Sequence, residues 1–204
     1  MVDKQLNLWT LFVSLAMVCF VYHFYTTVMH PVVIYPDKVN KILYLDEAFN
    51  QEEVELIGEA AEEWSLSTDG IVTYTIRQFP VEKVDYVNGI VIMKVNHYYP
   101  DVMEIDLALS QYTLGYCNSN GRIKHIGLVY DRLEDETFKP VVLHELGHSL
   151  GLKHNEDEDG VGTLMYPSID KGAPYITDKD LTHFCALYHC DASKLHDQEE
   201  PLHP

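Results

Sequence analysis

The sequence predicts an α+β domain, because segments with strand character and segments with helix character follow one another along the chain. Short runs rich in β-branched and aromatic residues indicate strands at 41–45, 71–79, 90–95, 115–117 and 123–130. Longer segments with a helical pattern begin after Asn50, at Asp135 and after Thr177. The chain has 204 residues, which is enough for one domain and a short appendage.

Two of the three predicted helices carry a start signal and an apolar stripe. Asn50 with Glu53, and Thr177 with Asp180, have the spacing of a capping box. Apolar residues at helical spacing follow each signal: Val54, Ile57, Ala60, Ala61 and Trp64 in the first helix, and Leu181, Phe184, Leu187 and Tyr188 in the last. We interpret both stripes as core packing.

The middle helix is expected over 135–150 and contains a proline. Pro140 lacks a backbone N–H and is well tolerated only in the first turn of a helix. The sequence therefore predicts a helix over this range and leaves open a break or a late start near Phe138.

The N-terminal segment differs in composition from the rest of the chain. Residues 5–36 contain no Asp, Glu, Lys or Arg, and residues 6–28 are mostly apolar. As a helix, 6–28 would span about 34 Å, enough to cross a bilayer. We expect an uncleaved signal anchor, with a cleaved signal peptide as the alternative.

The charge of the chain limits its partners. The formal net charge is −18 and the pI is near 4.8. A strongly acidic chain is repelled by nucleic acids and by anionic lipid surfaces. We therefore expect no nucleic-acid partner.

The stretch HELGHSLGLKH, residues 144–154, has the spacing of a metal site. His144 and His148 are four apart and would lie on one face of a helix, next to Glu145. Gly151 can end that helix in a left-handed conformation, so that His154 returns as a third ligand. Three imidazoles with one open position are typical of a catalytic zinc, and a nearby Glu can act as general base.

This pattern, HExxHxxGxxH, resembles the zinc motif of the metzincin metallopeptidases, in which a Met-turn follows. The segment Thr163-Leu164-Met165-Tyr166-Pro167 has the form of that turn. The runs at 114–117 and 126–129 resemble the matrixin branch in particular. The resemblance covers about 41–189 and implies a mixed twisted sheet with helices and a small C-terminal helical subdomain.

The resemblance implies a zinc-dependent metalloendopeptidase that acts on a peptide or protein substrate. In that case His144, His148 and His154 hold one catalytic zinc ion, and Glu145 is the general base. The alternative is a non-proteolytic, zinc-binding surface or structural protein that has kept the scaffold. The presence of the carboxylate at position 145 argues against that alternative.

Two further roles are implied by the resemblance to the Met-turn. Met165 would lie beneath the zinc ligands as a packing floor without binding the metal. Pro167 and its neighbours would form a wall of the pocket for the residue after the scissile bond. Tyr166 is left out of the catalytic set, because it follows the methionine directly.

Additional metal sites are not expected, with one exception. Many matrixins have a second, structural zinc, but Tyr116 stands where one of its histidines would be, and His97 lacks an Asp two residues later; only His125 fits. The loop 155–159, NEDED, offers carboxylates to a calcium ion. The favoured interpretation of this loop is a solvated acidic surface.

Three cysteines lie outside the N-terminal segment. Cys185 and Cys190 are too far apart for a disulfide in a continuous helix, so they can pair only if the helix ends near Tyr188. A metal site formed by these two residues and His189 is an alternative. Because Cys117, Cys185 and Cys190 are odd in number, one of the three thiols stays free or pairs between chains.

Together these features predict an organisation of the whole chain. Residues 1–30 form the signal anchor or signal peptide, 31–40 a linker, 41–190 the metzincin-like peptidase domain and 191–204 a polar tail. We expect a single-pass membrane protein, held in the membrane through residues 6–28, with an exported catalytic domain; a secreted protein is the alternative. The sequence does not define the oligomeric state.

Overall fold

The computed structural model describes residues 38–79, 85, 87–96, 113–118 and 124–195. The predicted signal anchor at 6–28 lies outside these residues, as do most of the linker and the end of the tail. Within the described ranges, no helix is both long and apolar enough to cross a lipid bilayer.

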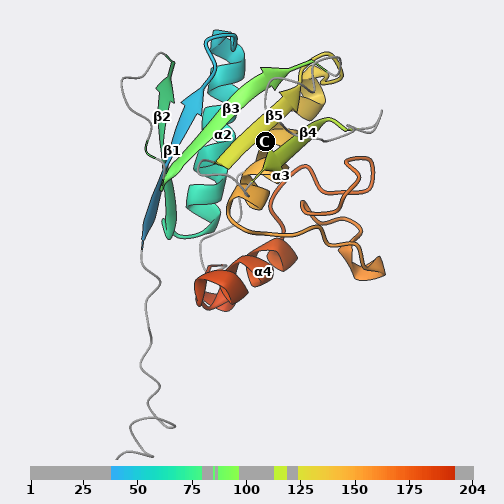
Figure 1. Ribbon diagram of the computed structural model, residues 1–204. Coiled ribbons are helices and arrows are strands. Elements are labelled where there is room, and N and C mark those ends of the chain that lie inside the picture. Colours follow the sequence, from blue (N-terminus) through green and yellow to red (C-terminus); the bar gives the residue numbers. More distant parts are fainter. Residues whose placement is uncertain (1–37, 80–84, 86, 97–112, 119–123, 196–204) are drawn as a thin grey trace, which may run out of the picture. The chain divides into compact units, whose positions relative to one another are not determined.

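A five-stranded mixed sheet forms one layer of the domain (Figure 1), as the sequence resemblance predicted. The strand order is β2-β1-β3-β5-β4, with parallel pairing throughout except between β4 and β5, which are antiparallel. The strands are β1 (Val39–Leu45), β2 (Val72–Gln78), β3 (Gly89–Val95), β4 (Gly115–Asn118) and β5 (Lys124–Val129). The short strand β4 therefore lies at the edge of the sheet.

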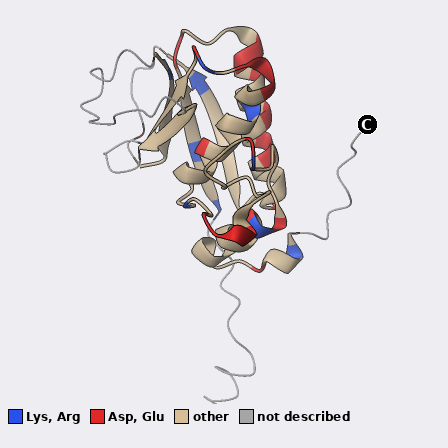
Figure 2. Ribbon diagram, turned by 90° about the vertical axis from the view of Figure 1, so that its right-hand side faces the viewer, with Lys and Arg blue, Asp and Glu red and all other residues tan. Residues whose placement is uncertain are grey.

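Helices α2 (Gln51–Ser67) and α3 (Asp135–Ser149) pack together against the sheet, and α4 (Asp178–Tyr188) follows near the end of the chain (Figure 1). Two short 3₁₀ helices are η3 (Glu158–Gly160) and η4 (Ala192–Lys194). The acidic side chains gather on the helices and loops rather than on the strands (Figure 2).

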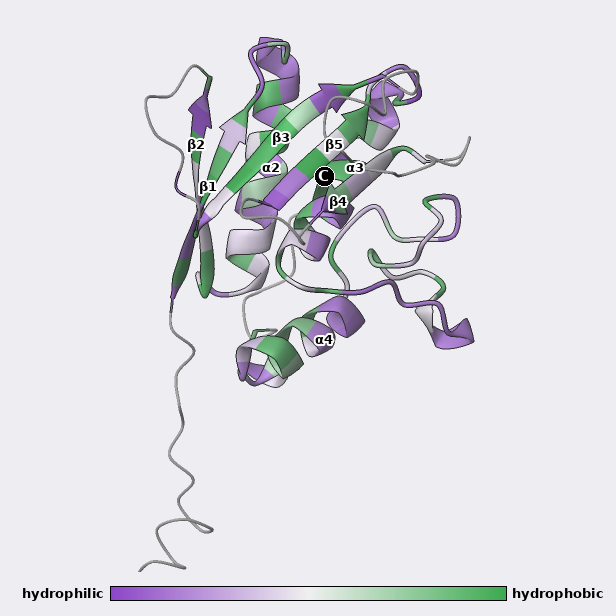
Figure 3. Cartoon of the chain, viewed as in Figure 1, coloured by the Kyte–Doolittle hydropathy of each residue, from purple (hydrophilic) through white to green (hydrophobic). Residues whose placement is uncertain are grey.

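The core lies between the sheet and the helices α2 and α3. Most of β3 and the second half of β5 are apolar (Figure 3), and the first four residues of β3 are buried. Trp64 of α2 is fully buried and donates its indole N–H to the carbonyl of Leu143 at 3.0 Å. This bond joins α2 to the middle of α3, so the apolar stripe of α2 is core, as predicted.

Both predicted capping boxes are present. Asn50 accepts from the Glu53 N–H at 3.0 Å, while Glu53 accepts from the Asn50 N–H at 2.8 Å. Thr177 and Asp180 make the same reciprocal pair at the start of α4. Such caps satisfy N–H groups that have no partner within the helix.

The break or late start left open near Phe138 does not occur. α3 runs without interruption from Asp135 to Ser149, with Pro140 inside it. Proline removes the hydrogen bond to the carbonyl four residues earlier, which here belongs to Glu136. Glu136 is exposed, so water can bond to that carbonyl, and burial of the remaining apolar residues of α3 favours the continuous helix.

Cys185 and Cys190 form a disulfide, with their Cα atoms 4.5 Å apart. The condition set by the sequence is met, because α4 ends at Tyr188 and His189 adopts a left-handed conformation with φ of 55°. The alternative metal site at these cysteines is therefore wrong, because both sulfurs are used in the bridge. Cys117 is free and half-buried.

We predict that replacing Cys185 and Cys190 together by serine lowers the free energy of unfolding by about 2 kcal/mol. This is the chain-entropy effect expected for so short a closed loop. Urea denaturation of the parent and the double variant would measure the difference in the free energy of unfolding. Cys117→Ser, which leaves the disulfide intact, is the control, and a double variant as stable as the parent would mean that the disulfide contributes nothing.

Candidate active site

The end of α3 brings the predicted motif together. His144 and His148 lie one turn apart on α3. The helix then ends, and Gly151 has a φ of 99°, the left-handed conformation that the sequence predicted there. The Leu152 N–H bonds back to the Gly147 carbonyl at 3.1 Å, which closes the C-terminal turn. The chain reverses direction at this point and returns with His154.

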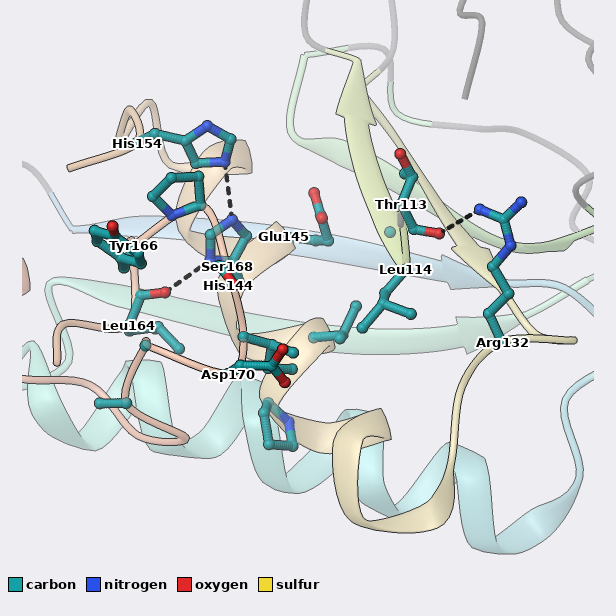
Figure 4. A pocket seen from close by; sticks show the side chains of 17 residues that line it. Thr113, Leu114, Arg132, His144, Glu145, His154, Leu164, Tyr166, Ser168 and Asp170 are labelled. Atoms are coloured by element: carbon teal, nitrogen blue, oxygen red, sulfur yellow. Dashed lines mark hydrogen bonds between the residues drawn. The ribbon is translucent and has the colours of Figure 1, made fainter. Parts of the chain in front are cut away.

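The three imidazoles converge on one point. The Nε2 atom of His154 lies 3.2 Å from that of His144 and 3.0 Å from that of His148. Figure 4 shows two of these rings facing each other across the site. Tetrahedral ligands with Zn–N bonds of about 2.0–2.1 Å lie about 3.3 Å apart, so these residues fit a zinc ion.

The outer nitrogens of two of the rings are held by backbone carbonyls. His144 Nδ1 donates to the Leu164 carbonyl at 2.7 Å, and His148 Nδ1 donates to the Leu152 carbonyl at 2.9 Å. These bonds leave the Nε2 lone pairs facing the centre of the site. Burial, together with the neighbouring imidazole of His148, lowers the pKa of His144 to about 4, and burial also lowers the pKa of His148 and His154. The rings are thus held in the neutral form that binds metals.

Glu145 lies beside the imidazoles and is only 4% exposed. Its Oε2 atom is buried and has no hydrogen-bond partner among the described residues. Gly115 of β4 makes room for it, since a Cβ atom there would lie 2.9 Å from Oε1. Burial raises the pKa of Glu145 to about 8. A divalent cation at the histidines would favour the ionised carboxylate, and a water molecule between them would satisfy Oε2.

Met165 packs against α3. It is fully buried, and a Cβ atom at Gly147 would lie 2.6 Å from its sulfur. The absence of a side chain at Gly147 therefore allows the methionine to pack against α3 between the two histidines of the helix. Among the described residues, the histidines at 144, 148 and 154 are the one group placed to hold a metal ion, and Met165 is not needed to complete it.

A pocket of about 790 Å³ opens beside His144 and Glu145. Its walls come from the edge strand, from α3 and from the segment after Met165 (Figure 4). The lining is mixed. Its apolar residues are Leu114, Pro140, Val141, Leu164, Pro167, Ile169 and Ala173, and its polar residues include Thr113, Arg132, Tyr166, Ser168 and Asp170 beside the site residues. Pro167 is one of the residues that line this pocket.

Among the described residues, those considered for other metals form no second group placed to hold an ion. The Tyr116 ring packs over Gly127, where a Cβ atom would lie 2.4 Å from the ring. His125 is on β5, and His97 lies outside the described residues. Calcium binding by the loop 155–159 stays a prediction.

Sequence analysis missed a second role of Asp180, beyond its capping box. Its carboxylate accepts hydrogen bonds from two backbone N–H groups of the Met-turn.

The fold and the three-histidine site define the chain as a metzincin-like zinc metallopeptidase. The family model for Matrixin matches residues 37–189, and the chain belongs to this family. Its fold is similar to that of archaemetzincin from Methanopyrus kandleri, with a TM-score of 0.53 and 15% identity over 77% of this chain and 99% of that one. A zinc-dependent peptidase from Methanocorpusculum labreanum matches with a TM-score of 0.42 and 16% identity over 71% and 99%. No curated protein matches the sequence.

The burial of Glu145 predicts a pH effect on the metal-free protein. Its folded pKa of about 8 exceeds its ordinary value of 4.5, so the folded state holds more protons between these values. Stability should therefore fall as the pH rises from 4.5 to 8. We expect Glu145→Gln to be more stable than the parent at pH 8.5, on the order of 2 kcal/mol, and to lose this advantage at pH 4.5. Urea titrations in chelator would contradict this if the difference did not grow with pH.

Proposed function

We propose that the chain is a zinc-dependent metalloendopeptidase with His144, His148 and His154 as metal ligands and Glu145 as general base. One observation carries the proposal. Three Nε2 atoms face a common centre, and Glu145, whose buried Oε2 has no partner among the described residues, lies beside them in the wall of a pocket. A structural zinc site would close the fourth position with another side chain, and the described residues offer none there.

Zinc, when bound, lowers the pKa of a water molecule to about 7 and polarises the carbonyl of the scissile peptide. Glu145 takes a proton from the attacking water molecule while the oxygen of that water bonds to the carbonyl carbon. Glu145 then gives this proton to the leaving nitrogen as the C–N bond breaks. A base is most effective when its pKa lies near the working pH. Burial raises the pKa of Glu145, and a cation held by the imidazoles would lower it again.

Cleavage within a chain, rather than at its end, is supported by the position of β4. This strand is at the edge of the sheet, so an extended peptide can add to it through backbone hydrogen bonds. Gly115 of this strand packs against the Glu145 side chain. The segment extends from Gly115 to Thr113 on one side and to Asn118 on the other. A substrate can therefore pair with the strand before and after the scissile bond.

The Met-turn residues have supporting roles in this proposal. Met165 supports α3 by packing against it at Gly147. It does not bind the metal, which is held by the imidazoles. Pro167 forms part of the wall that contacts the side chain after the scissile bond.

Export of the peptidase domain is part of the proposal. The Cys185–Cys190 disulfide supports it, because disulfides persist in oxidising compartments. Residues 6–28 would act as the membrane anchor. Carbonate extraction of membranes, with sequencing of the mature N-terminus, distinguishes an anchored protein from one released by cleavage after about residue 25.

The activity is tested with a mixed peptide library and identification of the products by mass spectrometry. We expect cleavage at internal bonds, loss of activity with a chelator and recovery on adding zinc. Metal analysis should give one zinc per chain. A protein that binds zinc and cleaves no peptide would overturn the proposal in favour of a non-proteolytic scaffold.

A further inference from the structure

Asp180 is a buried carboxylate in the first turn of α4, 1% exposed. Its oxygens accept four hydrogen bonds from neutral donors: Leu164 N at 2.9 Å, Met165 N at 3.1 Å, Thr177 N at 2.9 Å and Thr177 Oγ1 at 2.6 Å. Two of the four donors belong to the α4 cap and two belong to the Met-turn. A carboxylate that only accepts matches the ionised form.

One peptide group connects this carboxylate to His144. The Met165 N–H donates to Asp180 Oδ1, and the carbonyl of the same peptide group, that of Leu164, accepts from His144 Nδ1 at 2.7 Å. The chain of bonds is therefore carboxylate, amide, imidazole. Hydrogen bonds in such a series polarise one another, most strongly where a charge stands at one end.

We propose that Asp180 is a positioning residue of the metal site that acts on His144 through the Leu164–Met165 peptide group. Ligand histidines that donate their outer N–H to a carboxylate have a fixed ring and a more basic ligand nitrogen. Here the amide transmits part of this effect, and the same carboxylate holds the carbonyl in place. The inference rests on the proposed function of His144 as a zinc ligand.

His148 provides an internal comparison. Its Nδ1 also donates to a backbone carbonyl, that of Leu152, at 2.9 Å. The N–H of that peptide group belongs to Lys153, and within the described chain it donates to no carboxylate. The two histidines on α3 are thus held alike, but only His144 is connected to a negative charge through its peptide partner.

The first test is zinc affinity, measured by competition with a chromophoric chelator. Asp180→Asn keeps the size of the side chain and removes its charge, and we expect the dissociation constant for zinc to rise about 10-fold. Thr177→Val is the matched control. It removes one bond to the same carboxylate on the α4 side and leaves both Met-turn bonds, so it should lower the melting temperature without changing zinc affinity. Equal affinity in Asp180→Asn and the parent would overturn the inference.

A second measurement needs no variant and decides the question if Asp180→Asn does not fold. In the zinc-loaded parent, the Nδ1 proton of His144 should resonate further downfield and exchange more slowly than that of His148. Similar or reversed behaviour would contradict the proposed connection. A parent protein that binds no zinc would instead remove the proposed function, and this inference with it.

Discussion

Replacing Glu145 by glutamine is expected to lower the rate of peptide hydrolysis at least 100-fold while zinc stays bound. Glutamine keeps the size of the side chain but cannot accept the proton of the attacking water, a step that typically contributes about 10²–10⁴-fold. The proposed metal ligands are imidazoles, and the Nδ1 partners of His144 and His148 are backbone carbonyls that the substitution does not touch. Initial rates with one cleaved peptide, and zinc content by metal analysis, measure the two effects separately.

The control for this variant is Glu62→Gln. Glu62 is an exposed residue of α2, remote in sequence from the motif, and its replacement makes the same change of charge. We expect parent-like rates from it. If Glu145→Gln cleaved peptides as fast as the parent, the general base would have to be another group, and the proposed mechanism would be wrong.

The local features of the site follow from sequence because they depend on short spacings. A helix places residues four apart on one face, which brings His144 and His148 together whatever surrounds them. The left-handed turn at Gly151 and the capping box at Asn50 depend on a few neighbouring residues, and both are present. The disulfide between Cys185 and Cys190 could be stated only as a condition, because it depends on where α4 ends.

Other features depend on contacts that are distant in sequence. Glu145 is buried against β4, and β4 is placed by its pairing with β5. The sequence of so short a strand does not reveal which strand it pairs with. Asp180 could be recognised as part of a capping box but not as the partner of the Met-turn, since the two meet only through tertiary packing. The continuous helix through Pro140 has the same origin: packing overrides a local signal against helix.

His148→Ala should abolish peptide hydrolysis by a different route from Glu145→Gln, because it removes a metal ligand. With two imidazoles left, we expect zinc affinity to fall by more than about 100-fold. This is more than the loss of about 10–100-fold that follows when a hydrogen-bond partner of a ligand is replaced. The fold should persist without metal. Burial lowers the pKa of His148, so its imidazole reduces the stability of the metal-free parent as the pH falls below its ordinary value of 6.5, and alanine removes that effect.

Chelator competition at pH 7 would measure the change in zinc affinity. Thermal unfolding followed by circular dichroism at pH 7 and again at pH 5.5 would measure the change in stability. His183→Ala is the matched control, because His183 is exposed on α4 and its loss should alter neither zinc affinity nor rate. Parent-like zinc affinity in His148→Ala would show that this imidazole is not a ligand. Loss of zinc with an intact fold, beside retention of zinc with lost activity in Glu145→Gln, would separate the residues that hold the metal from the one that moves the proton.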